Sequence, residues 1–173
     1  TYGPGSSMEF SAIFGAGSFQ HIGFGGGTDA NGSGGIYNGD GLNIPELIEY
    51  IKINKILKGF PNASSITNEE LLTLKVDGLF PCALEGQIDT HNAENIKAKV
   101  IVEGANGPVS VAATKILHKK GVFIAPDVIA NGGGVIVSYF EWVQDIMSLF
   151  WDEEEVNNRL KTIILRAFDV GFK

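Results

Sequence analysis

Small residues and amide side chains gather in three turns, each of which directly follows a short apolar run. The runs cover residues 76–80, 99–103 and 122–125, and the turns after the last two hold Asn106 and Asn131. An amide side chain both donates and accepts hydrogen bonds, as the recognition of a neutral polar group requires. We therefore expect the three turns to line a cofactor cleft, and a dinucleotide is the ligand that this arrangement predicts.

Parallel strands are the elements that would hold these turns together. Near-continuous apolar runs separated by helix-length connections are typical of strands buried on both faces of a parallel sheet. Crossover helices are expected over residues 89–96 and 110–120, since parallel strands need such connections. The carboxyl ends of the strands would then meet at one edge. The predicted fold class is α/β, a Rossmann-like doubly wound parallel sheet followed by C-terminal helices.

Helical spacing of apolar residues predicts further helices on both sides of this sheet. One is expected at about 45–57, and a short one after Thr67, whose spacing to Glu70 matches a capping box. Beyond the last strand an apolar stripe predicts a helix over 135–150, and Asp152 is the expected N-cap of a final helix. The residues of that final helix expected to face inward are Val156, Leu160, Ile163, Ile164 and Ala167.

Composition and charge narrow the class of protein. The chain has 173 residues, of which 44% are hydrophobic, as in a folded globular domain. A net charge of −7 without a Lys/Arg-rich stripe argues against nucleic acid or an anionic membrane as partner. The single cysteine, Cys82, is expected to be an inert packing residue, because no neighbouring base or cation would activate it. With no apolar run of membrane-spanning length and no leader-like start, the expected location is the cytoplasm, or a mitochondrion in a eukaryote.

Other ionisable residues carry no recognisable catalytic or metal-binding spacing. For the glutamates the favoured interpretation is structural pairing or contact with a helix N-terminus, and for the histidines it is that no metal is bound. The residues concerned are Glu85, Glu103, Glu141, His21, His91 and His118.

The glycine-rich start of the chain is the segment where a phosphate-binding turn is expected. Residues 10–14 can form a strand, and Gly15 and Gly17 the turn after it, but Gln20 stands where the third glycine of a dinucleotide motif belongs. A second register places the turn at 23–28. Since the room before Asp29 is too short for a full helix and strand, residues 1–32 are expected to be an irregular or truncated start, with a shortened first βαβ unit. Residues 33–173 would form the Rossmann-like domain.

A family resemblance rests on five longer stretches. Residues 34–38, 66–72, 83–88, 102–108 and 126–144 resemble the C-terminal, cofactor-binding domain of glutamate dehydrogenases. The resemblance extends from about residue 33 to residue 170. Within the wider group of amino-acid dehydrogenases, the stretch Ser-Tyr-Phe-Glu-Trp-Val-Gln that begins at Ser138 is more similar to the glutamate enzymes than to the leucine, phenylalanine or valine enzymes.

The resemblance implies roles for single residues. Asn106 and Asn131 match asparagines beside the nicotinamide and its ribose, and Ala83 matches a backbone loop that passes the cofactor ribose. Val135 and Ser138 match positions of the substrate pocket, where a hydroxyl can bind the distal carboxylate of glutamate. Simpler interpretations remain open, since each asparagine could merely cap a turn and Ser138 could bond its own helix backbone.

The resemblance also implies an activity that this chain would share with another domain. Asp29 resembles the acid that accepts the adenosine ribose hydroxyls, which favours NAD over NADP because a carboxylate repels a 2′-phosphate. The catalytic lysine and aspartate are expected on a preceding domain absent from this chain. The implied reaction is oxidative deamination of L-glutamate to 2-oxoglutarate and ammonia with NAD(P), in a homo-oligomer that is a hexamer in the family. The alternatives are a non-catalytic nucleotide-binding or interaction module and a fragment of a branched-chain or aromatic amino-acid dehydrogenase.

Overall fold

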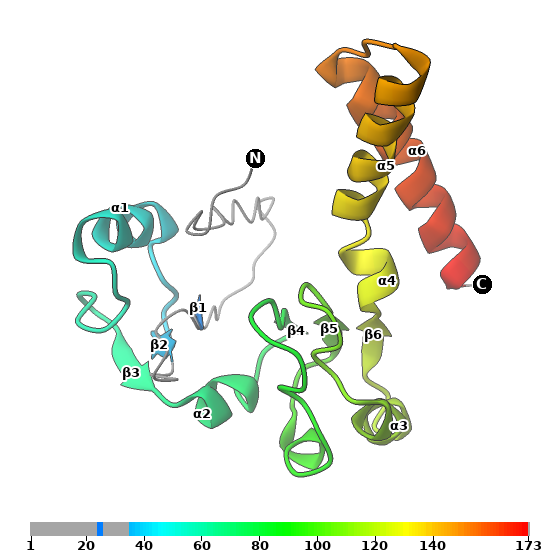
Figure 1. The fold of residues 1–173 in the computed structure, drawn as a ribbon. Coiled ribbons are helices and arrows are strands. Elements are labelled where there is room, and N and C mark those ends of the chain that lie inside the picture. Colours follow the sequence, from blue (N-terminus) through cyan, green and yellow to red (C-terminus); the bar gives the residue numbers. More distant parts are fainter. Residues whose placement is uncertain (1–23, 26–34, 173) are drawn as a thin grey trace.

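The first part of the chain forms a small antiparallel sheet with two helices. The computed structural model describes residues 24–25 and 35–172, and in it the sheet has the order β1-β2-β3. The elements are β1 (Phe24–Gly25), β2 (Gly35–Tyr37), α1 (Ile44–Asn54), β3 (Ser64–Ile66) and α2 (Asn68–Leu72) (Figure 1). The sequence patterns did not predict this sheet, because strands of three residues are too short to show alternation.

The capping box predicted at Thr67 is confirmed, and the helix expected at about 45–57 is present with different bounds. The hydroxyl of Thr67 accepts from the backbone N–H of Glu70, whose carboxylate accepts from the N–H of Thr67, so the capping box is present. Helix α1 begins one residue before the expected position, with Asn43 as its N-cap, and ends at Asn54 because Lys55 adopts a left-handed conformation. Helix α1 packs through Leu47 against Ile36 and Phe60 in a small core of its own.

The predicted parallel strands are present in a second sheet. Strands β4 (Gly78–Leu79), β5 (Val100–Val102) and β6 (Phe123–Ala125) pair in the order β4-β5-β6. Helix α3 (Val111–Lys119) crosses from β5 to β6 and places Ala113 and Leu117 in the core, both fully buried. The structure is thus a mixed α/β fold of the Rossmann-like kind, while the complete doubly wound arrangement remains a prediction.

Two expectations about this sheet are wrong in detail. The strands are not buried on both faces, since Phe123 of β6 is 44% exposed. The ring centroid of Phe123 lies 4.9 Å from that of Phe172, which covers the side chain only in part. The connection expected as a helix over 89–96 holds only the 3-10 turn η1 (Ala93–Asn95). The physical reason lies in the short polar side chains before it: Asp89 accepts from the N–H of His91, and Asn92 accepts from the N–H of Asp89, so they compete with helical bonding.

Three helices complete the chain after β6. Helices α4 (Asp127–Ala130), α5 (Gly133–Met147) and α6 (Glu153–Gly171) follow in sequence, and α5 and α6 lie side by side as a hairpin that extends away from the sheet (Figure 1). Asp152 caps α6 as predicted, its carboxylate accepting from the N–H of Glu155. The inward-facing stripe predicted for α6 is only partly right, because Ile163 and Ala167 are exposed. A two-helix hairpin buries only the seam between its helices, and here Phe140 of α5 is the buried member.

Some predictions fall on residues that the structure does not describe. Gly15, Gly17 and Asp29 all lie outside the described residues, as do most of residues 1–32. Among residues 24–25 and 35–172, no helix has the length and apolar character needed to cross a membrane.

Candidate functional site

The turns after the parallel strands are joined by backbone hydrogen bonds at the carboxyl edge of the sheet. The N–H of Ala105 donates to the carbonyl of Pro81 at 2.9 Å, and the N–H of Gly86 donates to the carbonyl of Gly107 at 2.9 Å. Ala83 lies exposed in the first of these turns. The structure therefore brings the turns after β4 and β5 together, as the sequence predicts.

Asn106 and Asn131 meet across the ends of β5 and β6. The side-chain Nδ2 of Asn131 donates to Oδ1 of Asn106 at 2.8 Å and lies 3.4 Å from the carbonyl oxygen of Gly104. Asn106 is exposed and Asn131 is half-buried. Within the described part of the chain, Nδ2 of Asn106 and Oδ1 of Asn131 have no hydrogen-bond partner, so the amide pair presents one donor and one acceptor.

Two carboxylates accept hydrogen bonds from the segments that carry this amide pair. Glu103 is only 6% exposed, and its Oε2 accepts from the backbone N–H of Asp127 at 2.9 Å. Asp127 in turn accepts from the N–H of Gly107 at 2.8 Å and, through its other oxygen, from the N–H of Val128 at 2.6 Å. Burial raises the pKa of Glu103, and the N–H of Asp127 partly offsets this effect.

The structural interpretation of Glu103 is thus supported, whereas the role of Asp127 was missed. Glu103 contacts the first residue of α4, which is the helix contact expected of it. Nothing in the sequence separates Asp127 from any other acid in the first turn of a helix. Its bond to Gly107 spans twenty residues and depends on the pairing of β5 with β6.

The positions assigned to a substrate pocket lie on α5. Val135 is 72% exposed, and Ser138 is exposed on the following turn. The hydroxyl of Ser138 donates to the carbonyl of Gly134 at 3.1 Å, which is the backbone bond that the simpler interpretation expects. The oxygen of that hydroxyl can still accept a hydrogen bond.

Cys82 packs closely against the turn after β5. A Cβ atom on Gly104 would collide with the sulfur of Cys82, so the absence of a side chain at position 104 allows this approach. Burial raises the pKa of the Cys82 thiol, which disfavours the reactive thiolate. Both observations support the packing role.

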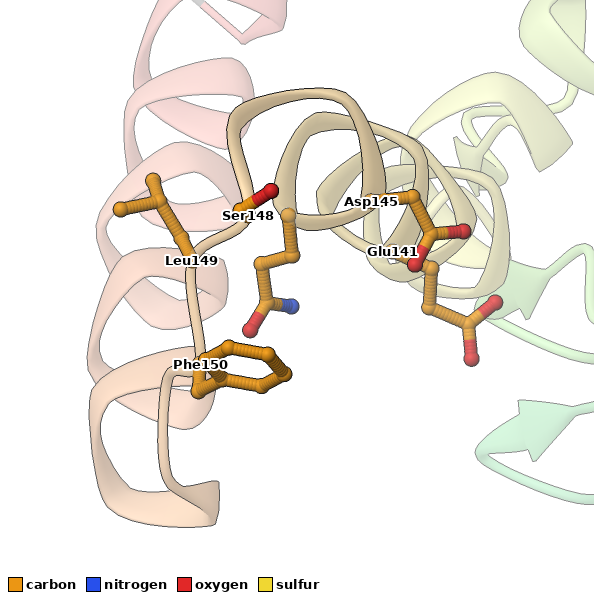
Figure 2. Close-up of a pocket in the computed structure, with 6 residues that line it drawn as sticks. Glu141, Asp145, Ser148, Leu149 and Phe150 are labelled. Carbon is orange, nitrogen blue, oxygen red and sulfur yellow. The ribbon is translucent and has the colours of Figure 1, made fainter.

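A hollow of about 550 Å³ lies elsewhere, beside the loop that joins α5 to α6. Figure 2 shows Glu141 and Asp145 projecting from the helix, with Leu149 and Phe150 on the loop. Gln144 bridges the helix and the loop, since its Oε1 accepts from the N–H of Trp151 at 2.7 Å. The hollow is at the opposite end of α5 from Asn131, so the strand-end edge is the better candidate site.

Comparison with known proteins identifies the family of the chain. The profile of the Glutamate/Leucine/Phenylalanine/Valine dehydrogenase family matches residues 27–173. A glutamate dehydrogenase of Thermotoga maritima is 53% identical over 136 residues, which is 79% of this chain and 33% of that protein.

Solved structures give the same result. The hetero-hexameric glutamate dehydrogenase of Thermus thermophilus, in its Leu-bound form, superposes with a TM-score of 0.69 at 34% identity, over 79% of this chain and 32% of that one. The glutamate dehydrogenase of Plasmodium falciparum gives 0.63 at 26% identity, over 78% and 31%. The chain spans about a third of the length of these relatives. It belongs to the Glutamate/Leucine/Phenylalanine/Valine dehydrogenase family.

Proposed function

We propose that this chain is the cofactor-binding part of a glutamate dehydrogenase, which converts L-glutamate to 2-oxoglutarate and ammonia. The observation that carries this proposal is the amide pair Asn106–Asn131 at the carboxyl edge of the parallel sheet. This edge is where open α/β sheets bind their ligands. The identity of 53% to a glutamate dehydrogenase supports glutamate, rather than another amino acid, as the substrate of the whole protein.

The amide pair fits the nicotinamide group of NAD or NADP. The carboxamide of nicotinamide has one carbonyl acceptor and one amino donor, and the pair offers Nδ2 of Asn106 and Oδ1 of Asn131 in return. The exposed turn at Ala83 is placed to pass the cofactor ribose. When bound, the cofactor would accept a hydride from the substrate.

The substrate side of the site would be shared with another domain. Val135 and Ser138 are exposed on α5. To bind the distal carboxylate of glutamate, the hydroxyl of Ser138 would donate to it in place of the carbonyl of Gly134. The catalytic lysine and aspartate are expected outside this chain. From the family resemblance we also propose a homohexamer for the whole protein, located in the cytoplasm or, in a eukaryote, in a mitochondrion.

The choice of cofactor is proposed to rest on Asp29. A carboxylate accepts hydrogen bonds from the adenosine ribose hydroxyls of NAD and repels the 2′-phosphate of NADP. NAD should therefore bind more tightly than NADP, and Asp29→Ser should narrow the difference. Equal affinities of the unaltered chain for both cofactors in calorimetric titration would remove Asp29 from this role.

Binding and turnover by the 173-residue chain test the proposal together. NAD should bind, Asn106→Ala should weaken it about fivefold to tenfold through the lost hydrogen bond, and glutamate should not be oxidised by this chain alone. The control is Asn157→Ala, which removes an exposed amide from α6. NAD binding unaffected by Asn106→Ala would place the cofactor elsewhere. If NAD binds but the whole protein does not oxidise glutamate, the non-catalytic nucleotide-binding module would be favoured.

A further inference from the structure

The side chain of Asn106 has a single described partner, the side chain of Asn131. It is exposed at the tip of the turn that follows β5, and its one described side-chain bond is the one that it accepts from Asn131. The orientation of the amide pair therefore depends on how its two supporting segments, the turn 104–108 and helix α4, are fixed to each other.

Glu103 and Asp127 make that connection from opposite sides. Glu103 belongs to the turn side, at the end of β5, and accepts from the backbone N–H of Asp127 at the start of α4. Asp127 belongs to the α4 side and accepts from the N–H of Gly107, next to Asn106. The two bonds run in opposite directions, so they form a reciprocal clasp between the segments that carry Asn106 and Asn131.

Both carboxylates of the clasp accept hydrogen bonds from backbone N–H groups. Both carboxylate oxygens of Asp127 accept from backbone N–H groups, those of Gly107 and Val128. Glu103 is buried, and its carboxylate accepts from the backbone N–H of Asp127. The described hydrogen bonds of both acids thus join the segments that carry Asn106 and Asn131.

We propose that Glu103 and Asp127 are positioning residues that hold Asn106 and Asn131 in the one orientation that recognises a carboxamide. This inference rests on the proposed function, since it assigns the cause of selectivity at the same site. It predicts that the chain discriminates NAD from nicotinic acid adenine dinucleotide, in which a carboxylate replaces the carboxamide. A carboxylate cannot donate to Oδ1 of Asn131, so it should bind about fivefold to tenfold more weakly.

Chemical-shift titration of the ¹⁵N-labelled chain measures this discrimination, even for weak ligands. Three ligands are compared: NAD, nicotinic acid adenine dinucleotide and ADP-ribose, which lacks the pyridine ring. Asp127→Ala and Glu103→Gln should reduce the preference for NAD over the acid analogue to about twofold or less, with the affinity for ADP-ribose unchanged. Asp145→Ala and Glu141→Gln are matched controls, because both remove an exposed carboxylate near the other end of α5.

The outcomes separate this inference from the proposed function. No binding of NAD, or a preference that survives Asn106→Ala, overturns the proposed site and the inference with it. A preference that Asn106→Ala abolishes but that Asp127→Ala and Glu103→Gln leave intact overturns only the inference. Equal loss of affinity for all three ligands also overturns it, because a merely structural role would produce that result. If circular dichroism shows that Asp127→Ala does not fold, Asp127→Asn replaces it and should give an intermediate preference.

Discussion

Replacing Lys120 by methionine should destabilise the parallel sheet measurably. The ammonium of Lys120 donates to three backbone carbonyls of the connection between β4 and β5, those of Ala93, Glu94 and Ile96. These carbonyls lie at the single turn η1, where too few helical N–H groups are available to pair them. Lys120 thus supplies the donors that a full crossover helix would have supplied.

The expected loss is about 1–2 kcal/mol. A hydrogen bond to a charged group contributes about 1.5–3 kcal/mol when it is shielded, but Lys120 is exposed and water can replace part of each bond, so we assign about 0.5 kcal/mol to each. Methionine keeps most of the aliphatic stem, so the change isolates the charged donor. For a chain of this length the melting temperature should fall by about 3–6 °C.

Thermal unfolding followed by circular dichroism measures this change, and Lys119→Met is the matched control. Lys119 is exposed on the last turn of α3 and has no hydrogen bond or ion pair among the residues that the structure describes. It should shift the melting temperature by no more than about 1 °C. Equal shifts for Lys119→Met and Lys120→Met would refute the bridging role of Lys120.

Three further predictions concern single contacts. Burial raises the pKa of Glu103 above its value in the unfolded chain, so the contribution of Glu103 to stability is full below the unfolded pKa and is lost as pH rises through the folded pKa. In urea titrations, the stability of the unaltered chain relative to Glu103→Gln should therefore fall from pH 4 to pH 7. A constant difference in stability would contradict this. Gly104→Ala should cost about 1–3 kcal/mol by overpacking against Cys82, and Cys82→Ala should relieve most of that cost in a double-mutant cycle. Thr67→Ala should cost about 1 kcal/mol in chemical denaturation by removing the capping box, and an unchanged midpoint would contradict this.

The sequence predicted those features that local patterns determine. The parallel strands follow from apolar runs, and the caps at Thr67 and Asp152 follow from residue types three positions apart. The helix predicted over 89–96 is absent because the side chains of Asp89 and Asn92 accept hydrogen bonds from nearby backbone N–H groups, and the spacing of apolar residues carries no information about such bonds.

The candidate site was predicted only in part, for a related reason. Sequence motifs indicated Asn106 and Asn131 as candidate site residues. In the structure, Nδ2 of Asn131 lies 2.8 Å from Oδ1 of Asn106 because β5 and β6 are paired. The bonds of Asp127 to Gly107 and of Lys120 to Ile96 join residues twenty or more positions apart. No periodicity encodes such bonds, since they exist only once the strands have paired.

The backbone bonds between the strand-end turns have a consequence for how this edge can change under mutation. Ala105 is tied to Pro81, and Gly86 to Gly107, through main-chain atoms alone. Any amino acid that tolerates the local conformation can make the same bonds, so exposed turn positions such as Leu84 should accept wide substitution in a saturation library. Gly86 and Gly107, with φ of 66° and 55°, should resist it. The outline of the edge can thus persist while its selectivity is altered through very few side chains.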